Sequence, residues 1–85
     1  MERLALLQAI QLNFTSKEIC NVFGKKRQIK KPIVDADGMS TGHHVCLRYT
    51  SVKGRNKKTE RIQATCYLTD TQIVHYFQIN ELLRF

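Results

Sequence analysis

Two clusters of basic residues are the part of this sequence best suited to chemistry, and that chemistry is the binding of polyanions. Eleven of the fourteen Lys and Arg residues belong to the two clusters. The first consists of Lys25, Lys26, Arg27, Lys30 and Lys31, and the second of Arg48, Lys53, Arg55, Lys57, Lys58 and Arg61. No acidic residue lies between Glu18 and Asp35 or between Asp37 and Glu60. Because surface charge that serves solubility normally mixes both signs, unmixed clusters predict a local positive field.

The net charge of +7 strengthens this interpretation. Such a charge attracts polyanions over a Debye length of about 8 Å at physiological salt. We therefore expect a small DNA-binding protein with a regulatory or accessory role, such as transcription regulation, in which the eleven clustered cations contact phosphates. RNA is the weaker choice of nucleic acid, because aromatic residues that could stack on bases make up only 8% of the chain. The alternative is a small protein-interaction module or inhibitor, of the phage or plasmid type, that docks on an acidic partner protein.

Metal binding and catalysis have little support in the sequence. His43, His44, Cys46 and Cys66 are the side chains that a zinc site would use, but no Cys-x₂-Cys or His-x₃₋₅-His spacing is present. No carboxylate pair is evident, and a cysteine such as Cys20 inside a helix is usually a small core residue. We expect no metal, no cofactor, no catalytic residue and no enzymatic activity.

Length and cysteine count limit the domain organisation and the compartment. The 85 residues are enough for one domain, residues 1–85, with one modest core. The odd number of cysteines, three, favours reduced thiols in the cytoplasm. The N-terminal segment has an acidic residue at position 2 and no long apolar run, so we expect neither a signal peptide nor a membrane span.

Two helices are predicted before the first basic cluster. Apolar residues at helical spacing predict the first helix over residues 2–12. Thr15 and Glu18 have the spacing of a capping box, and Phe14 and Ile19 that of a hydrophobic staple. Gly24 is suited to the left-handed residue that ends a helix. The second helix is therefore expected over residues 16–23, with Ile19, Cys20 and Phe23 on one face.

The second basic cluster falls on a predicted β-hairpin. Apolar residues are odd-numbered over residues 45–49 and even-numbered over residues 62–68, so they share a face only if paired positions add to an odd number. A sum of 111 pairs Val45 with Cys66 and puts the turn near Arg55 and Asn56. Cys46 then faces away from Cys66, so no disulfide is expected. The outward face would carry Arg48, Arg61, Gln63, Thr65 and Tyr67.

The segment over residues 25–31 allows two interpretations. A short helix there would complete a helix-turn-helix, with the hairpin as a wing. The other interpretation is a basic loop or arm along the DNA backbone, which is favoured because Pro32 ends any helix and Ile29 is the only apolar anchor. A short strand is expected over residues 32–35.

The last segment predicts a helix with a fourth strand as the rival interpretation. Thr69 and Gln72 have the spacing of another capping box. Surplus apolar surface at Ile79, Leu82 and Phe85 suggests a homodimer through this C-terminal helix. The expected fold class is thus α+β, with two N-terminal helices, a central antiparallel hairpin or three-stranded sheet, and a C-terminal helix, winged-helix-like if residues 25–31 are helical.

Overall fold

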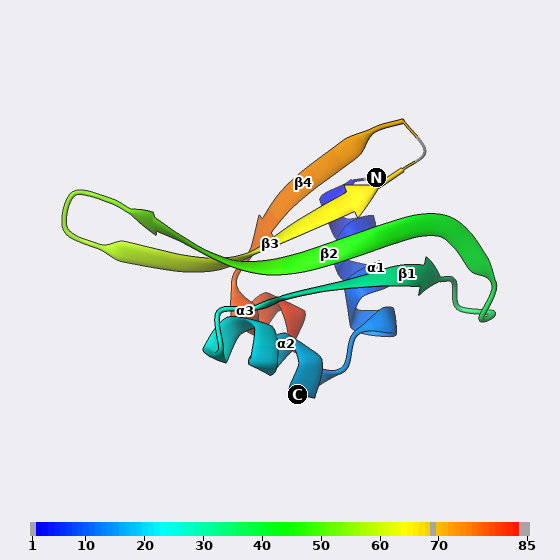
Figure 1. Cartoon of the computed structure of the whole chain (residues 1–85), viewed down its shortest axis with the longest axis horizontal. Helices are drawn as coiled ribbons and strands as arrows, with labels where there is room; N and C mark the ends of the chain where they lie inside the picture. Colours follow the sequence, from blue (N-terminus) through cyan, green and yellow to red (C-terminus); the bar gives the residue numbers. More distant parts are fainter. Residues whose placement is uncertain (1, 69, 84–85) are drawn as a thin grey trace.

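The protein is an α+β domain in which a short helix pair is followed by a four-stranded antiparallel sheet and one more short helix (Figure 1). The computed structural model describes residues 2–68 and 70–83. In chain order the elements are α1 (Arg3–Asn13), α2 (Ser16–Gly24), β1 (Gln28–Val34), β2 (Ser40–Lys53), β3 (Lys58–Tyr67), β4 (Gln72–Phe77) and α3 (Ile79–Leu82). The strand order in the sheet is β1-β2-β3-β4, so each strand pairs with its neighbour in sequence. The predicted fold class is confirmed.

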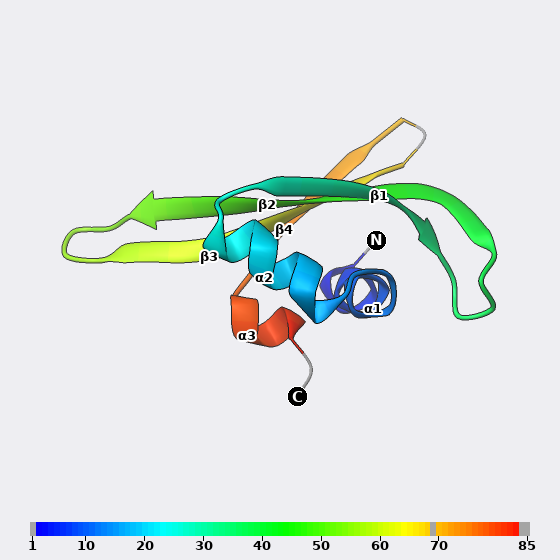
Figure 2. The ribbon, with the colours of Figure 1, turned by 60° about the horizontal axis from the view of Figure 1, so that its bottom comes forward.

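All the described helices lie on one face of the sheet, and the other face carries no helix (Figure 2). The core lies between these two layers. Its fully buried members include Leu6, Ile10, Ile19, Val45, Leu47, Ile62, Ala64, Cys66, Phe77 and Leu82. One face of every strand therefore packs on the helices, and the side chains of the other face alternate outward.

The local signals around α2 are confirmed. The Thr15 hydroxyl accepts a hydrogen bond from the backbone N–H of Glu18 at 3.1 Å, and the Glu18 carboxylate accepts one from the backbone N–H of Thr15 at 2.9 Å. Phe14 and Ile19 are both buried. Gly24, however, is the last helical residue, and Lys26 with φ of 53° is the left-handed one, so the predicted role of Gly24 was wrong.

The hairpin register is confirmed at every position that the sequence specified. Val45 pairs with Cys66, and the ladder continues to Lys53 opposite Lys58. The turn therefore lies at residues 54–57. The pattern could fix this register because a slip by one residue would turn one strand's apolar side chains away from the core.

Two segments for which the sequence allowed a helix are strands in the structure. Residues 28–31 belong to β1, where Ile29 pairs with Leu47, so the second helix of a helix-turn-helix is absent and that interpretation was wrong. The favoured interpretation, a basic loop over residues 25–31, holds only for residues 25–27, because pairing with β2 makes the rest a strand. β1 is an edge strand, which explains how it accommodates Pro32. Residues 72–77 form β4, as in the rival interpretation, because they pair with β3 while their odd-numbered side chains face the core. Thr69, half of the predicted capping box, lies outside the described residues.

Two single-residue expectations also need correction. Cys20 is exposed, because the face of α2 that packs on the sheet is formed by Ile19 and Val22. Leu82, expected on a dimer surface, is 1% exposed and belongs to the chain's own core. Ile79 packs partly against the same core, and Phe85 lies outside the described residues.

Candidate nucleic-acid interface

A two-stranded arm extends beyond the rest of the sheet (Figure 1). β1 stops pairing at Arg48, where it contributes Gln28, and β4 stops pairing at Ile62, where it contributes Phe77. Beyond those positions β2 and β3 pair only with each other. We call residues 50–61 the arm. The arm lies along the longest dimension of the molecule, which measures 44 Å.

The arm carries a concentrated positive charge. Four exposed cations lie at its tip, namely Lys53, Arg55, Lys57 and Lys58. Lys53 and Lys58 are direct cross-strand partners, and like charges in that position destabilise a hairpin. The only carboxylate on the arm belongs to Glu60, whose oxygen lies 3.9 Å from the Lys58 ammonium and accepts a hydrogen bond from the Tyr49 hydroxyl at 2.9 Å. The tip therefore retains an excess of positive charge that a polyanion would neutralise.

The turn between α2 and β1 brings the first basic cluster to the base of the arm. The Tyr49 backbone N–H donates a hydrogen bond to the Arg27 carbonyl oxygen at 3.2 Å. The Tyr49 ring lies edge-on to Phe23 with 5.7 Å between ring centres, and the Lys26 ammonium lies 5.5 Å from the centre of the Tyr49 ring. Lys25, Lys26 and Arg27, all exposed, thus flank the arm where it leaves the core.

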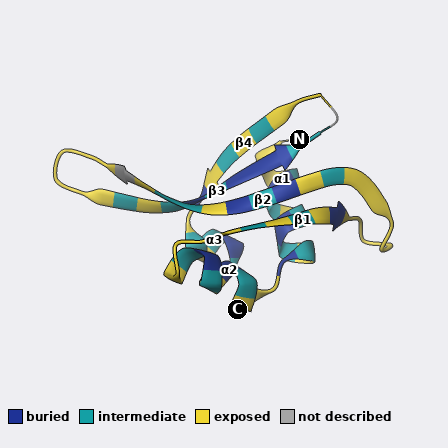
Figure 3. Cartoon of the chain, in the orientation of Figure 1, coloured by how far each residue is buried: buried dark blue, intermediate teal, exposed yellow. Residues whose placement is uncertain are grey.

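The uncovered face of the sheet gathers polar, basic and aromatic side chains from all four strands. We call it the open face. The residues that define it are Gln28, Lys30, His44, Cys46, Arg48, Arg61, Gln63, Thr65, Tyr67, Val74 and Tyr76. Figure 3 shows the contrast along β2 and β3: buried residues dominate the centre of the sheet, and exposed ones dominate the arm.

Strand pairing orders the open face into rows. One row runs from Gln28 through Arg48 and Gln63 to Tyr76, one residue from each strand. In another part of the face the Lys30 ammonium lies 4.5 Å from the centre of the Tyr67 ring, a cation–π contact. The register thus places all the outward residues that the sequence named on one surface, together with cations from both clusters.

Carboxylates lie elsewhere in the described part of the chain. Asp35 and Asp37 follow β1 in the turn to β2, and Asp70 lies between β3 and β4. Glu18 and Glu81 lie on helices and form ion pairs with Lys31 and Arg3. Side-chain alternation puts Glu60 on the same face as Ile62, the face that the helices cover farther along β3. The open face therefore has a single sign of charge.

One of the predicted site residues, Lys31, is separated from the others. The Lys31 ammonium lies 2.7 Å from the Glu18 carboxylate on the helix-covered side. Its hydrogen bond to Glu18 is the main reason why the pKa of that carboxyl lies below its ordinary value. Arg61 stays on the open face, just beyond the end of β4, where its guanidinium donates to the Glu60 carbonyl oxygen at 2.9 Å and its charge helps to lower the pKa of Glu81. Lys31 aside, the ten other clustered cations form the candidate interface.

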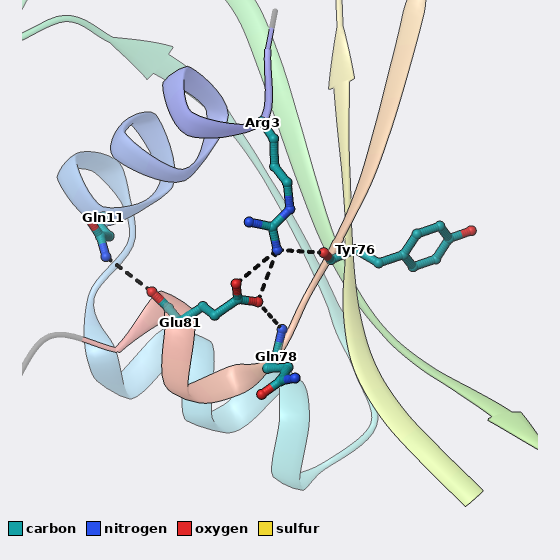
Figure 4. Close-up of polar contacts among 5 residues, drawn as sticks. All are labelled: Arg3, Gln11, Tyr76, Gln78 and Glu81. Carbon is teal, nitrogen blue, oxygen red and sulfur yellow. Dashed lines mark hydrogen bonds and ion pairs between the residues drawn. The ribbon is translucent and has the colours of Figure 1, made fainter.

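Tyr76 was missed as a site residue because the sequence interpretation placed it on a helix. The signal that could have found it is the alternation of Ile73, His75 and Phe77 with outward residues. Figure 4 shows how its backbone is held: the Arg3 guanidinium donates to the Tyr76 carbonyl oxygen at 3.1 Å and to Glu81 at 2.9 Å, while the Tyr76 ring projects to the opposite side. Arg3 also lies 4.4 Å from the centre of the Phe77 ring.

A metal-binding cluster and a membrane-spanning helix are both absent from residues 2–68 and 70–83. No group of three or more His, Cys, Asp or Glu side chains is arranged to hold a metal ion in that part of the chain. No helix within it has the length and apolar character needed to cross a membrane. The three cysteines are free. Comparison of the chain with family models, curated proteins and solved structures finds no match.

Proposed function

We propose that this protein binds duplex DNA by inserting its arm into a groove. The observation that carries the proposal is the projecting two-stranded ribbon whose tip holds four exposed cations, two of them directly opposed. The major groove of B-DNA, about 12 Å wide, admits a two-stranded β-ribbon. Two strands lie about 4.8 Å apart, so the ribbon with its side chains has the right width for that groove.

The cations have distinct tasks in this mode of binding. Lys53 and Lys58 point to the same side of the ribbon and would contact phosphates, which relieves their mutual repulsion. Arg55, at the turn, is the residue best placed to reach base edges, because the arginine fork pairs with guanine. Lys26 and Arg27 at the base of the arm would meet the DNA backbone farther along the duplex. The free thiols favour a reducing compartment, and we place the protein in the cytoplasm.

The salt dependence of duplex binding tests this proposal. Five phosphate contacts would give a slope of log affinity against log salt of about −4.5. Changing Lys57 to Gln should reduce the size of that slope by about 0.9 and weaken binding to random and specific duplexes alike. Lys17, an exposed lysine on α2 outside both clusters, provides the matched control Lys17→Gln.

The fourfold variant Lys53→Gln, Arg55→Gln, Lys57→Gln and Lys58→Gln should lose most of the salt-dependent affinity for duplex DNA. The proposal fails if wild-type affinity is insensitive to salt, or if Lys17→Gln changes the slope as much as Lys57→Gln does. A wild-type protein that binds no duplex even at low salt, but is retained by an acidic protein surface through the same arm residues, would establish the protein-docking alternative in its place.

A further inference from the structure

We propose that the open face is a second site, which binds the unpaired bases of single-stranded nucleic acid. This inference deepens the proposed function and rests on it for the class of ligand, but it uses a different surface from the arm. Two tyrosine rings lie on the open face among cations and amides, and its described strand residues include no carboxylate. Aromatic rings with adjacent cations are what proteins use to bind single strands, because every base has a face that can stack.

The open face and the arm differ in width, and this difference decides which form of nucleic acid each can bind. Four strands at about 4.8 Å span roughly 14 Å between the outer strand axes, before side chains are added. That span exceeds the major groove of B-DNA, about 12 Å, and the minor groove, about 6 Å. The open face therefore does not fit an undistorted duplex groove, whereas the arm does. A broad, uncovered sheet is better suited to bases that have left the helix stack.

Tyr76 is the better stacking platform of the two tyrosines. Its side chain is 53% exposed and points away from the helices (Figure 4). Its backbone is fixed by the hydrogen bond from Arg3, and Arg3 is in turn held by both oxygens of Glu81. A ring on a rigid strand loses little conformational freedom when a base stacks on it.

Tyr67 provides a second position. Lys30 lies over one side of its ring at 4.5 Å, where the ammonium can hold a phosphate while a base stacks on the side that remains open. Gln63, four residues before Tyr67 on β3, pairs with Tyr76, so the two tyrosines are roughly 14 Å apart. Bases stacked in a duplex strand rise about 3.4 Å each, so each ring receives its own base rather than adjacent ones.

The polar residues beside Tyr76 supply the remaining interactions. Arg48 and Gln63 are neighbours in the row that ends at Tyr76. A guanidinium can pair with phosphate, and an amide can donate to and accept from the edge of an unstacked base. The site is thus a cationic surface with two separate rings and with hydrogen-bonding groups in the row of Tyr76.

Binding of labelled oligonucleotides to wild type and ring variants tests the inference. The probes are a single-stranded DNA and a single-stranded RNA of about ten nucleotides, within the range of known single-strand sites, and a blunt DNA duplex. Tyr76→Leu should weaken single-strand binding by roughly 5- to 150-fold, the range for loss of one stacked base. Tyr76→Phe keeps the ring and should stay within about twofold of wild type. Duplex binding should not change in either variant, because the arm is intact.

Intrinsic fluorescence supplies an independent readout, because the chain has three tyrosines and no tryptophan. A stacked base should quench the tyrosine signal of wild type on addition of single strands, and the quenching should shrink in the double variant Tyr67→Leu, Tyr76→Leu. Either sugar supports the inference, and the tighter probe identifies which is preferred.

Three results would overturn it: no single-strand binding by a wild-type protein that binds duplex, equal affinity of Tyr76→Leu and wild type, or equal losses in the Leu and Phe variants. The first of these leaves the proposed duplex function standing. A wild-type protein that binds single strands through the two rings but binds no duplex would instead contradict the proposed role of the arm and support that of the open face.

Discussion

Lys26 shows how much one residue can contribute to the position of a site. It adopts a left-handed backbone with φ of 53°, which only a small fraction of residues other than glycine do. That conformation turns the chain from α2 into β1, so that Arg27 accepts the hydrogen bond from Tyr49. The same residue places its ammonium near the Tyr49 ring. A single turn residue thus joins the first basic cluster to the base of the arm.

Thiol reactivity should report the packing of individual residues. Cys20 is exposed, Cys46 is half-buried and Cys66 is fully buried. Burial also raises the pKa of the Cys66 thiol, which lowers the fraction of reactive thiolate. We expect iodoacetamide to alkylate Cys20 first, Cys46 more slowly and Cys66 only on unfolding, as measured by mass spectrometry of digested protein.

Labelling in concentrated urea is the control, because all three thiols should then react at similar rates. Rapid alkylation of Cys66 under native conditions would contradict the packing of β3 on the helices. Slow alkylation of Cys20 would restore the sequence-based expectation that this thiol belongs to the core.

At the level of elements, α2 and α3 are each joined to another element by an ion pair of a helix-capping glutamate. In α2 and in α3 the carboxylate that completes the capping box also binds a cation from another element: Glu18 binds Lys31 of β1, and Glu81 binds Arg3 of α1. Each carboxylate therefore caps a helix and links it to its neighbour. Loss of either charge should weaken a cap and a tertiary contact together.

Acid should weaken these caps and ion pairs, because it protonates the carboxylates. Hydrogen bonding by the Gln78 backbone N–H, with help from Arg3, holds the pKa of Glu81 below its ordinary value of 4.5. A carboxyl whose pKa is lowered by folding stabilises the protein above that ordinary value, and the contribution is lost as the pH falls through the lowered pKa. Glu81→Gln should therefore be less stable than wild type at neutral pH and lose less stability on acidification, as measured by urea denaturation.

Asp37→Asn is the matched control, because Asp37 lies in the β1–β2 turn and its carboxylate has no partner among the hydrogen bonds of the described residues. The unfolding free energy of Asp37→Asn should equal that of wild type both at neutral pH and at acid pH. A parallel shift of the Glu81→Gln and wild-type curves over the whole acid range would show that Glu81 contributes nothing through its charge.

The elements that the sequence could predict are those with their signals inside a short stretch of chain. The capping box at Thr15 and Glu18 and the alternation that set the hairpin register are local, and both were confirmed. β1 and β4 were harder because their own residues do not decide the element: Pro32 and the lysines of β1 also suit a loop, and each strand is completed only by pairing with its neighbour. The residues of β4 fit a helical stripe nearly as well as a strand, and pairing with β3 decided the outcome. Tyr76, and with it one corner of the open face, depended on that decision.

At the scale of the whole molecule, the arm and the core are stabilised by different interactions. Among the arm residues whose burial the structure describes, which are 50, 51 and 53–61, none belongs to the buried core. The arm is held by its own ladder and by contacts of Tyr49 at its base, whereas the central strands are covered by helices. Opposite charges also lie at opposite ends of the sheet. The turns that hold Asp35, Asp37 and Asp70 lie at the end away from the cationic arm (Figure 1).

Amide hydrogen exchange should separate these two parts. Arm amides should exchange through local opening, and amides of β2 and β3 inside the core only through global unfolding. In the free protein, added salt should slow exchange in the arm, because it screens the repulsion between Lys53 and Lys58. Added duplex DNA should slow it further, and salt should then have the opposite effect by weakening the complex.

The variant Lys58→Gln removes the like-charge pair and is the control: its free arm should exchange more slowly than that of wild type and respond less to salt. Equal protection in the arm and in the core strands would show that the hairpin opens as a single unit, contrary to the division described above.

The ladder of the arm also has a consequence for how such a protein can diverge. Deleting one cross-strand pair, such as Ser51 with Glu60, would shorten the ribbon by about 3.3 Å and rotate the tip so that its lysines appear on the opposite face. Deleting two pairs would restore the original face at about 6.6 Å less reach. Related proteins that keep the same orientation of charge toward their target should therefore have arms whose lengths differ by an even number of cross-strand pairs.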